Sequence, residues 1–183
     1  DVSDRARGMG AMRAYRAAFA AALPGRHRIH YASKALLNTA LAQIVAHEGL
    51  GLDVVSGAEL LVARRAGVPM ERVHLHGNAK SDAELRRAVA WGVGAIVVDN
   101  HDELERLAAL ATDAARPQGL LLRVAPNIDA QTHAHIATGG EHSKFGLPLA
   151  ALDAAAERVL AAPGLRLLGL HAHIGSQLFA LEE

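Results

Sequence analysis

The sequence predicts an α/β fold with a parallel sheet, a TIM-like (β/α)8 barrel of which about six βα units are present. Short runs rich in leucine and β-branched residues alternate with segments of helical spacing, at roughly two dozen residues per repeat. Side chains suited to helix capping precede the helical segments. A doubly wound sheet has the same alternation, but no G-x-G-x-x-G fingerprint follows the first strand, which favours the barrel.

The apolar runs define six strands, and the segments between them define the helices. We predict strands at 28–33, 52–55, 73–76, 95–99, 120–125 and 165–174. An alanine-rich helix precedes the first strand, and the predicted helices occupy 11–21, 38–48, 58–66, 82–91, 102–115 and 150–161. The connection at 126–148 has no clear element and exceeds ordinary loop length, and such loops are usually functional.

Capping residues stand at the expected ends of these helices. A side-chain oxygen before the first turn accepts a hydrogen bond from a backbone N–H that has no helical partner. The predicted N-caps are Asn38, Ser56, Ser81 and Asn100. Glycine tolerates the left-handed conformation that ends many helices, so Gly67 and Gly92 mark two predicted C-termini.

Composition excludes several classes of protein. The 183 residues are 51% hydrophobic, with 19 basic and 19 acidic side chains, so no basic field indicates nucleic acid or a membrane surface. Cysteine is absent, which excludes disulfides and a cysteine nucleophile within this stretch. No apolar run approaches the ~20 residues of a membrane span. We expect a soluble, cytoplasmic protein with a small-molecule partner, in which residues 1–183 form part of one domain of a longer chain.

Polar residues gather at the expected carboxyl ends of the strands, which is where barrel enzymes place catalytic groups. They come from five different strands: Lys34, Asp53, Asn78, Arg123 and His173. Each has a simpler interpretation by itself, because a strand-end lysine is usually solvated and a strand-end aspartate usually caps a turn. Arg123 could pair with Asp53. Their convergence on one rim makes a site the competing hypothesis.

Strand parity predicts which side chains share a face. In the first strand His30, Ala32 and Lys34 alternate with Ile29 and Tyr31. In the last strand the apolar set opposes the two histidines, and it consists of Leu168, Leu170 and Ile174. We expect the polar sets to point inward and the apolar sets to point toward the helices.

Three His-x-His pairs allow a metal-dependent barrel hydrolase as an alternative, because this spacing puts both rings on one face of a strand. The pairs are His74/His76, His133/His135 and His171/His173. The first strand has no such pair, and no inward carboxylate set is obvious beside them. We therefore assign no metal ligands and keep this reading second.

Five motifs in order resemble the fold-type III pyridoxal-phosphate decarboxylases, and among them the diaminopimelate decarboxylase family. They are "YASKA" at 31–35, "GLGLDVVSGAEL" at 49–60, "HGNAKS" at 76–81, "GGEHSKFGL" at 139–147 and "GLHAHIGSQ" at 169–177. The resemblance runs from about Ile29 to the end of the chain. It implies pyridoxal 5'-phosphate as cofactor and an amino acid as substrate, with meso-diaminopimelate decarboxylated to L-lysine.

The resemblance also implies the roles of individual residues. Lys34 would be the lysine that forms a Schiff base with the cofactor, and we expect its amine to be partly desolvated, which favours the nucleophilic neutral form. His173 would stack on the pyridine ring. The other implied cofactor contacts are Asp53 beside the lysine linkage, Glu59 supporting Asp53, Arg123 near the oxygen face of the ring, and Gly175 and Ser176 at the phosphate.

Further implications concern partners and substrate. Lys144 lies in what resembles a dimer-contact loop, so we expect a homodimer in the full-length protein. By the same resemblance two strands and a C-terminal β domain are absent, and the fragment itself would be inactive. Leu36 and Ala79 depart from the family pattern. Ornithine, arginine, carboxynorspermidine or a carrier-bound substrate therefore stay open, as does racemisation.

Overall fold

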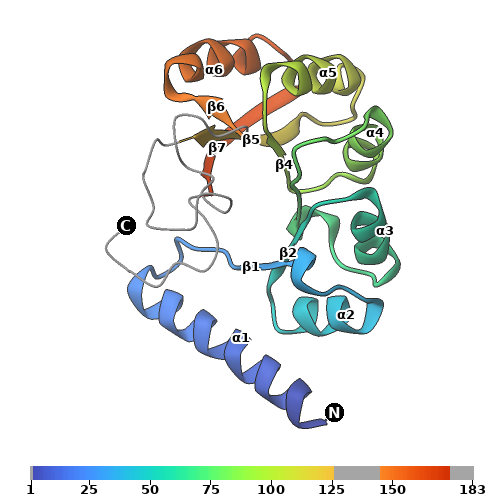
Figure 1. Ribbon diagram of the computed structural model, residues 1–183, viewed down its shortest axis with the longest axis vertical. Coiled ribbons are helices and arrows are strands. Elements are labelled where there is room, and N and C mark those ends of the chain that lie inside the picture. Colours follow the sequence, from blue (N-terminus) through green and yellow to red (C-terminus); the bar gives the residue numbers. More distant parts are fainter. Residues whose placement is uncertain (1, 126–144, 174–183) are drawn as a thin grey trace. The chain divides into compact units, whose positions relative to one another are not determined.

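The computed structural model describes residues 2–125 and 145–173, and it divides into two compact units, Asp1–Leu75 and His76–Glu183. In each unit parallel strands have helices along one face (Figure 1). A search of the described helices finds none with the length and hydropathy of a membrane-spanning segment. The predicted alternation of strand and helix is confirmed.

The first unit contains a three-stranded parallel sheet. Its elements are α1 (Val2–Ala22), β1 (His30–Ala32), the 3-10 turn Ser33–Ala35, α2 (Thr39–His47), β2 (Gly51–Val54), α3 (Gly57–Arg65), the 3-10 turn Met70–Arg72 and β3 (Val73–Leu75). Ala32 of β1 pairs with Asp53 of β2, and Asp53 pairs in turn with His74 of β3. This register sets the three strand ends beside one another.

The second unit has β5 at the centre of its sheet, with β4, β6 and β7 all parallel to it. Its elements are α4 (Asp82–Trp91), β4 (Ala95–Val98), α5 (His101–Ala111), β5 (Gln118–Ala125), β6 (Leu147–Pro148), the 3-10 turn Leu149–Ala151, α6 (Leu152–Leu160) and β7 (Leu165–Ala172). All four residues of β4 are buried, as expected of a strand covered on both faces.

The predicted caps form. The side chain of each predicted N-cap accepts a hydrogen bond from the backbone N–H three residues later. These N-caps are Asn38, Ser56, Ser81 and Asn100. Ser81 also completes a capping box with Glu84. Gly92 ends α4 in the left-handed conformation, with φ 68°, and Gly67 follows α3 with φ 75°. Hydrogen bonds to the backbone groups at the helix ends therefore determine these boundaries.

Several boundaries differ from the predictions: α1 begins at Val2 instead of residue 11, and α5 ends at Ala111 instead of residue 115. The first strand ends at Ala32, and Ser33–Ala35 form a 3-10 turn, so Lys34 follows β1 rather than extending its alternation. The two-residue strand β6 was not predicted, because only its pairing with Val124 and Ala125 defines it. A segment that short has no hydrophobic period of its own.

The last strand departs from the predicted inward and outward sets. Leu168 and Leu170 are 45% and 58% exposed instead of lying beneath helices. Leu168 is also the extra residue of a β-bulge, since Leu167 pairs with Leu120 and Gly169 with Leu121. Parity is otherwise preserved, because His171 lies on the less exposed face.

Candidate functional site

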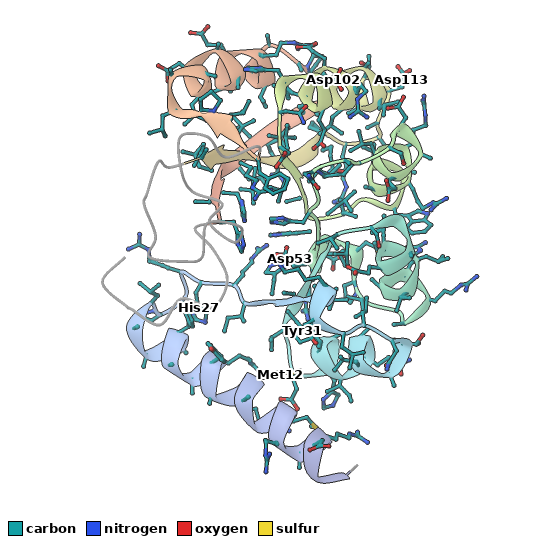
Figure 2. All side chains as sticks on the ribbon, in the orientation of Figure 1. Met12, His27, Tyr31, Asp53, Asp102 and Asp113 are labelled. Carbon is teal, nitrogen blue, oxygen red and sulfur yellow. The ribbon has the colours of Figure 1, made fainter. Side chains whose placement is uncertain are left out.

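In the first unit, Lys34 and Asp53 come together because β1 and β2 are neighbours. Ala32 pairs with Asp53, and Lys34 lies two residues beyond Ala32 in the 3-10 turn. Leu52 and Val54 are fully buried, whereas Asp53 projects from the other side of β2, away from α3 (Figure 2). Burial raises the pKa of Asp53 to about 6, and the positive charge of Lys34 opposes that rise.

Lys34 itself is exposed in the described part of the chain. Its neighbour Ser33 is 2% exposed, whereas Lys34 is exposed to solvent. The residue is therefore sterically accessible to a small molecule. Lys34 interacts with Asp53 through its positive charge, which lowers the pKa of that carboxyl.

Glu59 supports the loop that follows β2. Its carboxylate accepts a hydrogen bond from the backbone N–H of Val55 at 2.8 Å, and its own N–H donates to Ser56 Oγ at 3.2 Å. The two bonds hold the chain that leaves Asp53 and starts α3. Glu59 thus acts on the backbone next to Asp53.

Asp53 lies beside two histidines, His30 and His74. The sequence did not predict that these three side chains lie together. His30, Asp53 and His74 each offer one ligand atom, and these atoms all lie within 4.8 Å of one another. The imidazole centroids of His30 and His74 are 3.9 Å apart. The expectation that no inward carboxylate accompanies the histidine pairs is therefore wrong for His74, because the β2–β3 register puts Asp53 directly beside it.

In the second unit Arg123 is nine-tenths buried, and its partner is Asp99. The guanidinium donates to Asp99 Oδ1 at 2.8 Å and lies 5.1 Å from the ring centroid of Phe145. The suggested pairing with Asp53 is wrong as the principal contact. Val98 pairs with Leu122 across β4 and β5. The residues that follow them, Asp99 just after β4 and Arg123 in β5, therefore lie side by side.

His173 follows β7 and is half-buried near His171. Burial lowers the pKa of His171 to about 4, and the charges of Arg123 and His173 add to this shift. The His171 ring meets the ring of His76 edge to face, with centroids 4.3 Å apart. A neutral imidazole therefore lies beside Arg123 at neutral pH.

Lys80 and Glu103 form a buried ion pair that the sequence did not predict. Lys80 Nζ lies 2.7 Å from Glu103 Oε1 and donates to the carbonyl of Gly77 at 2.5 Å, and the two side chains are 2% and 0% exposed. Burial lowers the pKa of Lys80 and raises the pKa of Glu103, while their mutual attraction opposes both shifts. The one sequence feature that indicated this pair was the lysine in "HGNAKS", a motif from which only Asn78 was predicted as a site residue.

The remaining predicted residues are placed as follows. Asn78 is exposed in the loop after β3. Gly175, Ser176, Lys144 and the His133/His135 pair lie outside the described residues. Lys34, Asp53 and Glu59 belong to the first unit, and Arg123 and His173 belong to the second.

Comparison with known families gives a match over most of the chain. The family described as "Pyridoxal-dependent decarboxylase, pyridoxal binding domain" matches residues 9–183. The diaminopimelate decarboxylase of Mycobacterium leprae is 52% identical over 162 residues, which cover 87% of this chain and 34% of the relative. The enzyme of the same name from Bacillus subtilis is 47% identical over 154 residues, covering 83% and 35%. The chain thus spans about a third of the length of these relatives.

Solved structures give the same result for the fold. A diaminopimelate decarboxylase from Helicobacter pylori, complexed with L-lysine, has a TM-score of 0.86 at 30% identity, covering 95% of this chain and 44% of that one. A diaminopimelate decarboxylase from M. jannaschii, in co-complex with L-lysine, has a TM-score of 0.79 at 30% identity, covering 93% of this chain and 41% of that one. The predicted fold class, a parallel α/β barrel of which the chain carries part, is confirmed.

Proposed function

Because the chain belongs to the pyridoxal-dependent decarboxylases, whose pyridoxal binding domain it matches over residues 9–183, we propose that the complete protein decarboxylates a diamino acid. The substrate we propose is meso-diaminopimelate and the product L-lysine. Relatives near 50% identity bear the name diaminopimelate decarboxylase, and two similar structures contain L-lysine. The observation on which the proposal rests most is the exposed Lys34 amine beside the Asp53 carboxylate, within a chain of this family.

The residues present fit a pyridoxal cofactor in their chemistry. Pyridoxal phosphate supplies an aldehyde that condenses with an amine and a ring that withdraws electrons from the reacting bond. Lys34 provides an accessible amine, and the negative charge of Asp53 lies close to it. A lysine amine is the group from which such a cofactor forms its Schiff base with the protein.

We assign the roles of the site residues accordingly. Lys34 would hold the cofactor and would exchange protons with the substrate amine. Asp53 stabilises positive charge at the lysine linkage, and Glu59 fixes the loop that carries Asp53 through its bond to Val55. The further cofactor contacts that we propose are His173, Gly175, Ser176 and Arg123.

Arg123 and Asp99 contribute orientation. One guanidinium N–H is committed to Asp99, and the buried pair keeps the arginine plane fixed at the end of β5. A charge held in this way needs no reorganisation when a negative oxygen approaches it. We propose that Arg123 faces the oxygen of the cofactor ring through its remaining N–H groups.

The larger assembly is also part of the proposal. We propose that residues 1–183 belong to one cofactor-binding domain of a longer chain, and that the complete protein is a homodimer. The segment around Lys144 would supply the dimer contact, by its resemblance to the family loop. Sedimentation of the complete protein, with and without a Lys144→Glu substitution, measures this directly.

Carbon dioxide release from a panel of amino acids tests the reaction. The complete protein with pyridoxal phosphate should release carbon dioxide from meso-diaminopimelate and form lysine. Lys34→Ala should lower kcat/KM by more than about a thousandfold, because the nucleophile is lost. Arg26→Ala, which changes an exposed cation in the same unit, should leave kcat/KM unchanged.

The panel separates the alternatives. Faster release from ornithine or arginine would reject the proposed substrate while keeping the reaction class. Interconversion of stereoisomers without carbon dioxide would indicate a racemase. Activity that survives Lys34→Ala and is lost to a chelator would reject the proposal in favour of a metal hydrolase.

A further inference from the structure

His30 and His74, which lie beside Asp53, have no assigned role in the proposed reaction. The cluster of His30, Asp53 and His74 comes from three successive strands, and its three ligand atoms lie within 4.8 Å of one another. Each side chain is half-buried. Such a set, on a rigid sheet rather than on loops, has the donors of a metal site.

Strand register explains why the three side chains meet. Asp53 and His74 are direct partners across β2 and β3, so their side chains leave the same face at neighbouring positions. His30 pairs with Gly51, two residues before Asp53, and therefore lies diagonal to the carboxylate on that face. The three positions form one patch of the sheet.

Gly51 makes room for the His30 ring. A Cβ at this position would lie 2.6 Å from His30 Nδ1 and 2.4 Å from the carbonyl oxygen of Arg72, so any larger residue would force the ring away. The imidazole consequently lies over β2 and reaches the ring of His74, with centroids 3.9 Å apart and planes tilted by 30°. Without a glycine at this position the cluster would not assemble.

The donor set selects a class of ion. Two imidazole nitrogens and one carboxylate oxygen suit zinc and neighbouring divalent transition metals, whereas magnesium and calcium prefer oxygen alone. His30 Nδ1 is buried and has no hydrogen-bond partner among the described residues. This nitrogen can therefore bind a metal ion or a proton. The χ2 torsion of histidine is broad, which allows both rings to turn toward one ion.

We propose that His30, Asp53 and His74 bind one divalent first-row transition-metal ion, with zinc as the reference ion. Three protein ligands leave a coordination position for water. Because Asp53 also interacts with Lys34, a bound ion and the lysine ammonium compete for the same carboxylate. The proposed decarboxylation itself requires no ion, although Asp53 belongs to both sites.

Metal titration of the complete, tag-free protein tests the site. The probes are Co2+, followed by its visible absorption, and Zn2+, followed by calorimetry, after removal of bound metal with a chelator. We expect a site with micromolar or tighter affinity, and His30→Gln and His74→Gln should each weaken it at least tenfold. His101→Gln removes an exposed histidine at the start of α5 and should leave the affinity unchanged.

Circular dichroism of each variant confirms that the fold persists. Asp53→Asn, which preserves the shape of the side chain, provides a second test where a histidine variant does not fold, and it should also weaken binding at least tenfold. Equal Co2+ affinity in the parent protein and in the folded variants would overturn the proposal, as would binding in the millimolar range only. These readouts involve no decarboxylation, so they fail or succeed separately from the proposed activity.

Discussion

Each unit of the chain places one carboxylate near one lysine, Asp53 near Lys34 in the first and Glu103 near Lys80 in the second. The second pair is in contact at 2.7 Å and almost completely buried. In the first, Lys34 is exposed and its charge only partly offsets the cost of burying Asp53, because the pKa of Asp53 is still raised to about 6. The same two residue types thus serve different purposes.

The difference separates a buried, paired lysine from an accessible one. Lys80 donates both to Glu103 and to the carbonyl of Gly77, so its amine is fully engaged in holding the loop before α4. Lys34 has an accessible amine and a nearby carboxylate. Of the lysines in the described part of the chain, Lys34 is the one that can react with a small molecule without breaking a buried network.

The largest expected effect comes from breaking the buried pair. Lys80→Met leaves the Glu103 carboxylate buried without its cation and should lower the free energy of unfolding by about 3–5 kcal/mol. Urea denaturation of the complete protein, followed by circular dichroism, measures the change. The exposed cation variant Arg26→Ala serves as control and should unfold at the parent midpoint.

The double variant Lys80→Met/Glu103→Leu should recover most of that loss. Removing both charges abolishes the desolvation cost along with the attraction, and an apolar pair of similar volume is often as stable as the ion pair. A double variant that is no more stable than Lys80→Met would show that the pair holds the loop through a contact other than charge.

Asp53→Asn should act in the opposite direction on stability. Because burial raises the pKa of Asp53 to about 6, the ionised carboxylate disfavours the folded state at pH 7, and its removal should raise the free energy of unfolding by about 1–2 kcal/mol. The same substitution should lower kcat, because the charge beside Lys34 is lost. Loss of stability comparable to that of Lys80→Met would remove the contrast between the two units.

The smallest expected effect concerns pH. The pKa of His171 is lowered from 6.5 to about 4, so the unfolded chain binds a proton that the folded chain rejects between these values. Stability is therefore full above about pH 6.5 and falls as the pH decreases toward 4. After discounting for the half-exposed ring, the loss between pH 7 and 5 should be about 1 kcal/mol greater in the parent than in His171→Gln. Equal pH slopes would contradict the shift.

Local signals predicted the elements well, because each was written in a few neighbouring residues. The four N-caps form as predicted, and the 82–91 helix has the bounds of α4. Two of the misses are non-local. The strand β6 exists only through pairing with β5, and the bulge at Leu168 depends on the register of β7 against its neighbour.

The candidate site was predictable where a motif indicated it and not where partners are distant in sequence. Lys34 and Asp53 could be singled out as strand-end residues, and the structure brings their charges together. The prediction that Arg123 pairs with Asp53 was wrong, because identifying Asp99 as its partner requires the β4–β5 register. Glu103 could not be matched to Lys80 from the sequence, since 23 positions separate them.

Chemical trapping of the cofactor tests the central claim most directly. The complete protein, incubated with pyridoxal phosphate and reduced with borohydride, should retain the pyridoxyl group on the peptide that contains Lys34 when analysed by mass spectrometry. Lys34→Ala should abolish this label and the visible absorbance of the cofactor linkage. A pyridoxyl group found on Lys80 or on another lysine, with Lys34 unmodified, would contradict the assignment of Lys34 as the reactive amine.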